Sequence, residues 1–181
     1  WVSPMSSRCS FPERHPLFAG FLPAIREHIV TCLEAHDLIV ALGAPVFTYH
    51  IEGFGPHVPS GTALVQIVDD PAVAAWTPLG TALVCNVRHG VAAILEQSNP
   101  PARTAPSGRT APPRVSAEAG LSMAFLMQTL ADERPPDSII VEESPSSRRT
   151  MQAYLPIGRP HSFFTCASGG LGHSLPASVG I

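Results

Sequence analysis

Charged residues are scarce in this chain of 181 residues, and that scarcity excludes several classes of function. They make up 14% of the sequence, about half the usual share, and the net charge is −3. A chain with this balance has no basic surface for nucleic acid or anionic lipid. It also lacks a recognisable signal peptide and any apolar run near the ~20 residues that span a bilayer. We therefore expect neither a nucleic-acid partner nor a membrane-embedded segment.

Closely spaced cysteines are missing as well. Cys9, Cys32, Cys85 and Cys166 lie far apart and form no CxxC motif, which argues against a zinc or iron–sulfur site. Buried free thiols in a reducing compartment are the better interpretation of such spacing. The cysteine pattern thus favours a cytoplasmic protein.

The most informative stretch that is present is LIVALGAPVFTYH, residues 38–50. It begins with a short apolar run that Gly43 and Pro45 end, which predicts a parallel strand buried on both faces. The loop that follows is rich in aromatic and imidazole side chains, and ligands bind beyond the carboxyl ends of strands in α/β sheets. His50 in this loop is a candidate for proton transfer near neutral pH, with a hydrogen-bonded loop histidine as the alternative.

Apolar runs alternate with helical patterns along the first half of the chain. We expect strands at 38–42, 63–68 and 82–85, and helices at 22–33, 71–76 and 91–96. Pro23 would lie in the first turn of the first helix, and Asp70 would cap the second. This alternation predicts a doubly wound parallel sheet over residues 1–98.

A proline-rich segment at residues 99–115 has no aromatic side chain and no periodicity, which predicts a semi-rigid linker. A second α/β unit is expected from residue 116 to 181. Ser122 would cap a helix with an apolar stripe of Phe125, Leu126 and Leu130. Strands are expected at 139–141 and 163–164, each followed by a helix. Because the chain opens without an initiator methionine and closes in an apolar segment, we interpret it as an internal piece of a longer protein.

Hydroxyl and acidic side chains follow the expected strand at 139–141. Ser144, Ser146 and Ser147 precede a helix, where hydroxyl and amide groups suit a phosphate, with plain helix capping as the alternative. Glu142 and Glu143 are either catalytic carboxylates or a solvated strand end. The sequence leaves both questions open.

A second turn, Gly-Gly-Leu-Gly at residues 169–172, follows the expected strand at 163–164. Its glycines allow the backbone to approach a flat ligand closely, with Leu171 as an apolar wedge. A tight entry into a helix explains the same residues without any ligand.

Five segments carry a pattern that covers nearly the whole chain outside the proline-rich part. They are RCSFPERHPLFAGFLP (8–23), VALGAPVFTYH (40–50), IVDDPAVAAWTPLGTALV (67–84), IIVEESPSSRRTMQAYLP (139–156) and SFFTCASGGLGHSLPASVGI (162–181). Together they resemble the thiamine-diphosphate (ThDP)-dependent 2-oxo acid decarboxylases, and above all the benzoylformate decarboxylase branch. GAPVFxYH and ASGGLGxxLPAxVG are specific to this branch.

This resemblance implies that residues 1–98 are the later part of a middle domain and that 116–181 begin a C-terminal diphosphate-binding domain. It implies an enzyme that converts an aromatic 2-oxo acid, such as benzoylformate, into an aldehyde and CO₂, with carboligation as a side activity. ThDP and Mg²⁺ would be its cofactors. The metal ligands would lie beyond residue 181, and the glutamate that activates ThDP would lie before residue 1. The full-length protein would be a cytoplasmic homodimer or homotetramer.

The resemblance also implies roles for individual residues. His50 would reach the active site as the proton-transfer residue. The residues expected at the cofactor are Ser144, Pro145, Ser146, Gly169 and Leu171. Pro145 departs from relatives that have a hydroxyl residue there, and it has no N–H to donate. Gly169 would offer its carbonyl to the aminopyrimidine, and Leu171 would force ThDP into its bent shape.

A non-catalytic module is the alternative, because the middle domains of some related enzymes, such as acetolactate synthases, bind FAD or serve as structural units. The nearest approach to a dinucleotide fingerprint is Gly53-Phe-Gly55, which Pro56 interrupts and which follows a loop rather than a strand. The sequence therefore favours the enzyme over the nucleotide-binding module.

Overall fold

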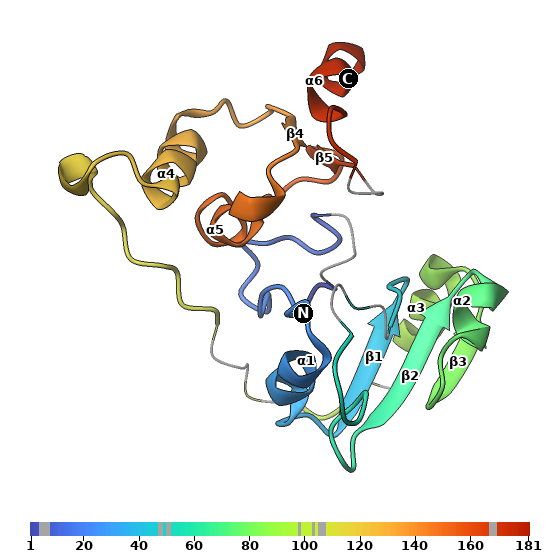
Figure 1. Cartoon of the computed structure of the whole chain (residues 1–181). Helices are drawn as coiled ribbons and strands as arrows, with labels where there is room; N and C mark the ends of the chain where they lie inside the picture. Colours follow the sequence, from blue (N-terminus) through green and yellow to red (C-terminus); the bar gives the residue numbers. More distant parts are fainter. Residues whose placement is uncertain are drawn as a thin grey trace. The chain divides into compact units, whose positions relative to one another are not determined.

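The computed structural model divides the chain into two compact units (Figure 1). Unit 1 comprises residues 1–6 and 21–104, and unit 2 comprises residues 7–20 and 105–181. The structure describes residues 1–3, 8–46, 49, 52–97, 99–102, 104, 108–166 and 170–181. His50 and Gly169 lie outside the described residues.

Unit 1 is built on a parallel three-stranded sheet in the order β1-β2-β3. Its elements are α1 (Arg26–Leu33), β1 (Leu38–Leu42), β2 (Ala63–Val68), α2 (Pro71–Ala75), β3 (Thr81–Val84) and α3 (Val87–Leu95). The three predicted strands are confirmed to within one residue. The predicted cap is also confirmed, since Asp70 Oδ1 accepts a hydrogen bond of 2.8 Å from the Ala72 amide.

Both faces of this sheet are covered over β2. Gln66 and Ile67 are consecutive strand residues and therefore point to opposite faces. Gln66 accepts a hydrogen bond of 2.6 Å from the Thr77 hydroxyl, just after α2. Gly90 of α3 lies against the side chain of Ile67, where a Cβ would approach Ile67 Cγ2 to 2.8 Å. Segments on opposite faces are the mark of a doubly wound sheet, as predicted.

The prediction that β1 is buried on both faces is wrong. Leu38, Val40 and Leu42 are 49%, 45% and 49% exposed, and only Ala41 on the other face is buried. On the exposed face α3 covers β2, where Ile67 is 1% exposed, and leaves the β1 side chains open.

Two helix starts also differ from the prediction. The first helix begins at Arg26 rather than at residue 22, because Leu22 donates its amide to the Val2 carbonyl (2.9 Å) and Ile25 is extended. Helix α3 begins four residues earlier than expected, because the side chain of Asn86 accepts the Arg88 amide (3.1 Å) and caps it.

Unit 2 is also α/β. Its elements are η1 (Ala117–Ala119), α4 (Met123–Glu133), β4 (Ile140–Glu142), η2 (Pro145–Ser147), α5 (Arg148–Tyr154), β5 (Phe163–Thr165) and α6 (Ser174–Gly180). Strands β4 and β5 pair in parallel, which places Glu142 beside Thr165. The buried core consists of Met127, Met151, Leu155, Ile157 and Phe163. The α/β prediction with parallel sheets is thus confirmed in both units.

Helix α4 begins as predicted but buries a different face. Ser122 Oγ accepts the Phe125 amide at 3.1 Å, which confirms the cap. Leu126 and Leu130 of the expected stripe are 52% and 42% exposed, whereas Met127 is buried. The buried Gln128 beside it exchanges two hydrogen bonds of 3.0 Å with the backbone of Val115. These two hydrogen bonds fix the face that α4 presents to the rest of unit 2.

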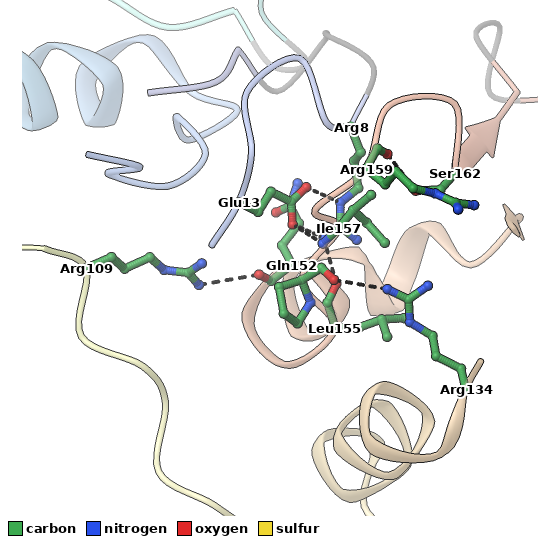
Figure 2. Close-up of polar contacts among 10 residues, drawn as sticks. Arg8, Glu13, Arg109, Arg134, Gln152, Leu155, Ile157, Arg159 and Ser162 are labelled. Atoms are coloured by element: carbon green, nitrogen blue, oxygen red, sulfur yellow. Dashed lines mark hydrogen bonds and ion pairs between the residues drawn. The ribbon is translucent and has the colours of Figure 1, made fainter. Parts of the chain in front are cut away.

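Residues 8–20 belong to unit 2, although in the sequence they lie between the two parts of unit 1. Arg8 and Glu13 form an ion pair whose side chains are 5% and 0% exposed. Glu13 also binds the backbone of Ile157 through both its amide (3.2 Å) and its carboxylate (2.9 Å) (Figure 2). The linker expected at 99–115 stays a prediction. The structure shows in addition that an early segment, residues 8–20, belongs to unit 2.

Arginines from three separate segments bind carbonyl groups at the end of α5 (Figure 2). Arg8 donates to Leu155 O at 2.8 Å, Arg109 to Gln152 O at 3.4 Å and Arg134 to Pro156 O at 3.4 Å. The last carbonyls of a helix have no partner within it and carry partial negative charge. Guanidinium groups therefore satisfy them and draw distant segments together.

We predict that Glu13→Ala destabilises unit 2 by about 3–5 kcal/mol, because it leaves the Arg8 charge buried without its carboxylate. Urea unfolding of the chain followed by circular dichroism measures the change. Glu118→Ala, at an exposed position, is the control and should change stability by less than about 0.5 kcal/mol. An equal, small effect of both substitutions would contradict the prediction.

Candidate functional site

The carboxyl ends of β4 and β5 form one edge of the unit 2 sheet, because the strands are parallel. Ser144, Pro145 and Ser146 follow β4 after one intervening residue, Glu143, and Leu171 lies in the segment after β5. The structure therefore brings these predicted cofactor residues to the same edge. Ligand sites in α/β sheets lie at such edges.

Glu142 ends β4 and is fully engaged. Its Oε1 accepts the Ser144 amide at 2.6 Å, and its Oε2 accepts the Thr165 hydroxyl at 2.8 Å and the Arg148 guanidinium at 3.1 Å. The side chain is 0% exposed. Burial alone would raise the pKa of Glu142, but the Ser144 amide, the Thr165 hydroxyl and Arg148 together hold it below its ordinary value. The solvated strand end considered from the sequence is wrong for this residue, which is an ionised structural carboxylate.

Glu143 connects the two turns of this edge. Its Oε1 accepts the Gly172 amide, and its Oε2 accepts the Ser174 amide at 2.7 Å. Hydrogen bonds from these amides, Ser174 first and then Gly172, lower the pKa of Glu143, with a smaller contribution from His173. One carboxylate after β4 thus holds the backbone at the start of α6.

The serine turn itself leaves groups free for a ligand. Ser147 donates its amide to Ser144 O at 2.9 Å, which closes the turn. Pro145 and Ser146 are exposed, and the Ser146 side chain makes no hydrogen bond with another described residue. The alternative of plain capping is wrong here, because neither Ser144 nor Ser147 accepts a capping hydrogen bond through its side chain. Ser146 Oγ is therefore available as a donor at the strand edge.

Apolar side chains extend from this edge into the solvent. Leu171, Leu175 and Val179 recur every four residues and are 81%, 81% and 86% exposed. Gly172 between them has a φ of +83°, a backbone angle that favours glycine. Leu171, for which the wedge role is predicted, thus points outward next to a glycine in the left-handed region.

The loop after β1 is held by α1 within unit 1. The Arg26 guanidinium lies 5.0 Å from the centre of the Tyr49 ring and forms an ion pair with Glu52. The Tyr49 hydroxyl lies 2.7 Å from His57 Nδ1. Burial, and then the nearby Arg26 charge, lower the pKa of His57, which favours the neutral imidazole at pH 7. The loop flanking His50 is therefore anchored on both sides of that position.

A cavity of about 320 Å³ lies along β5 in unit 2. It is lined by Arg8, Cys9, Ser10, Pro160, His161, Phe163, Phe164 and Thr165. Thr165, at one end of the strand, is also a partner of Glu142. The cavity thus begins beside the edge that carries the two turns.

Within the described ranges, no group of three or more histidine, cysteine or acidic side chains is placed to hold a metal ion. None of the helices described is long and apolar enough to cross a membrane. None of the four cysteines forms a disulfide, as predicted, but all four are partly exposed rather than buried.

We predict that Glu142→Gln lowers the melting temperature of unit 2 at pH 7, because the neutral amide loses charge-assisted hydrogen bonds of about 2 kcal/mol. The folded pKa is depressed, so the contribution is full above an unfolded glutamate pKa of about 4.3 and is lost as the pH falls through the lower folded value. Calorimetry across pH 2–7 should show the two proteins converging in acid. A constant difference would contradict this assignment, and Glu133→Gln is the exposed control.

Decarboxylases are among the curated and solved proteins that this chain resembles. No protein-family model matches the chain. Benzoylformate decarboxylase of Pseudomonas aeruginosa is 42% identical over 181 residues, which are 99% of this chain and 34% of that protein.

Two solved structures match this chain over the same share of its length. The ThDP-dependent 4-hydroxybenzoylformate decarboxylase of Rhodococcus jostii RHA1 is 39% identical with a TM-score of 0.89, over 99% of this chain and 34% of that one. Benzoylformate decarboxylase from Polynucleobacter necessarius is 34% identical with a TM-score of 0.92, again over 99% and 34%. The chain thus spans about one third of the length of these relatives. In sequence and in fold, it is similar over nearly its whole length to that third of the ThDP-dependent 2-oxo acid decarboxylases, which confirms the resemblance found in its motifs.

Proposed function

We propose that this chain forms part of an enzyme that decarboxylates an aromatic 2-oxo acid, benzoylformate or a close analogue, to the aldehyde and CO₂. The single observation that carries the proposal is the link that Glu143 makes at one sheet edge between the serine turn and the backbone of Gly172 and Ser174. The relatives' names, which state this reaction and its cofactor, support it. Carboligation is proposed as a side activity.

The donor set at the edge fits the diphosphate of ThDP. Two acidic side chains beside a diphosphate would repel it if their charges were free. Here Glu142 is buried on Arg148, and Glu143 is engaged by two backbone amides. The exposed Ser146 hydroxyl then remains as a donor, while Pro145 contributes no N–H. Ser144, Ser146 and the Gly169–Leu171 turn would hold the cofactor, which supplies the nucleophile and the electron sink when bound.

His50 is proposed as the residue that moves protons around the bound substrate. A histidine suits this task because its ordinary pKa lies near neutrality. Support comes from the anchored loop: the Arg26 and Glu27 side chains of α1 bind Gly55 O at 3.1 Å and the Phe54 amide at 2.8 Å. A loop held on one helix can present an imidazole in a defined place.

The remaining assignments follow the family resemblance. Mg²⁺ is proposed as the second cofactor, with its ligands outside residues 1–181. A homodimer or homotetramer in the cytoplasm is proposed for the full-length protein. The FAD-binding or purely structural module is not favoured, because three relatives that match 99% of this chain are named as decarboxylases.

We predict that the full-length protein releases CO₂ from benzoylformate only with ThDP and Mg²⁺, and that His50→Ala lowers kcat/KM by about 10²–10⁴-fold. A coupled assay for the aldehyde measures the rate. His89→Ala, on the exposed side of α3, is the matched control and should retain the wild-type rate. Cofactor-independent turnover, or equal effects of the two substitutions, would overturn the proposal.

Residues 1–181 alone should bind ThDP only weakly, because the proposed metal ligands and activating glutamate are not among them. Isothermal titration of this chain with ThDP and Mg²⁺ tests the expectation. A dissociation constant in the micromolar range or below would show that the described turns suffice to hold the cofactor.

A further inference from the structure

We infer that Glu143 is the positioning residue that sets the Leu171 turn against the serine turn. The inference rests on the proposed function for what the two turns hold, but its geometry stands by itself. Glu143 is the residue between Glu142, which ends β4, and Ser144, which begins the serine turn. Its carboxylate reaches across to the other turn.

The contact is made at two points of the second turn. One oxygen accepts the Gly172 amide and the other accepts the Ser174 amide at 2.7 Å. A carboxylate bound through both oxygens cannot rotate without losing one of the bonds, so it fixes the orientation as well as the distance. Leu171 is the residue directly before the first of these amides.

The Leu171 side chain is 81% exposed, so packing within this chain does not hold it. Gly172 has a φ of +83°, where its backbone has more freedom than that of any other residue type. Neither the exposed leucine nor the glycine restricts this turn strongly by itself, and the Glu143 carboxylate supplies a restraint through its two hydrogen bonds.

Glu142 supports this arrangement from the neighbouring position. It is anchored to Thr165 at the end of β5 and to Arg148 at the start of α5. Glu143 therefore extends from a strand end that is itself fixed. Glu142 and Glu143 thus attach both turns to the end of β4, so Leu171 and the exposed Ser146 would move together.

Amide hydrogen exchange on this chain tests the geometry without any cofactor. Glu143→Gln keeps only one acceptor oxygen, and we expect the Gly172 and Ser174 amides to exchange about ten- to a hundredfold faster. In the wild type the protection should fall as pH drops below the pKa of Glu143, after correction for intrinsic rates. His173 is the titratable neighbour that faces this carboxylate. His173→Gln should leave most of the protection in place, and Glu133→Gln should change nothing.

Binding by the full-length protein tests the consequence. Glu143→Gln should weaken ThDP binding at least about tenfold, with a melting temperature close to that of Glu133→Gln. Unchanged exchange at Gly172 and Ser174 would overturn the inference regardless of cofactor. Faster exchange with unchanged ThDP affinity would overturn it too, since the contact would then be only structural. A wild-type protein that does not bind ThDP would instead refute the proposed function, and the exchange result would remain interpretable on its own.

Discussion

Two consecutive carboxylates at the end of β4 are the constraint on which the candidate site depends. Glu142 is bound to the end of β5 and to the start of α5, and Glu143 is bound to the start of α6. Because the strands are parallel, the segments that follow them leave from the same edge. The two carboxylates fix the distances between the segments that leave this edge, which lie up to 31 residues apart in the sequence. Hydrogen bonds from their donors lower the pKa of both carboxylates, which favours the anionic form at neutral pH.

A second network of hydrogen bonds, at the end of α5, also holds unit 2 together. The carbonyls at the end of α5 accept hydrogen bonds from arginines of the early segment, of the proline-rich segment and of α4 (Figure 2). The same physical principle works at both places. Backbone groups without a partner at a helix end are satisfied by charged side chains from elsewhere. Here, however, the arginines bind carbonyls, whereas at α6 a carboxylate binds amides, as the direction of the helix dipole requires.

The proposed decarboxylase places different demands on the two units. Unit 2 contributes an edge with an exposed hydroxyl and an outward leucine, both of which suit a bound cofactor. Unit 1 contributes an anchored aromatic loop, in which Arg26 contacts Tyr49 and Tyr49 contacts His57. Rigid anchoring matters for proton transfer, because the rate depends on the distance between donor and acceptor. The exposed leucines of β1 and α6 show that neither unit buries all of its apolar surface by itself.

The sequence alone determined the order and type of the strands, the caps at Asp70 and Ser122, the α/β class and the family resemblance. These features depend on residues close together in the chain, so local patterns report them. It did not determine which side chains are buried: Leu38 and Leu42 are half exposed, and Glu142 is fully enclosed. Nor did it reveal that residues 8–20 pack on unit 2 or that Glu143 holds Gly172. The last two outcomes depend on partners 29 to 147 residues away. Only the folded chain decides which distant groups meet, because burial and hydrogen bonding are settled by the whole packing at once.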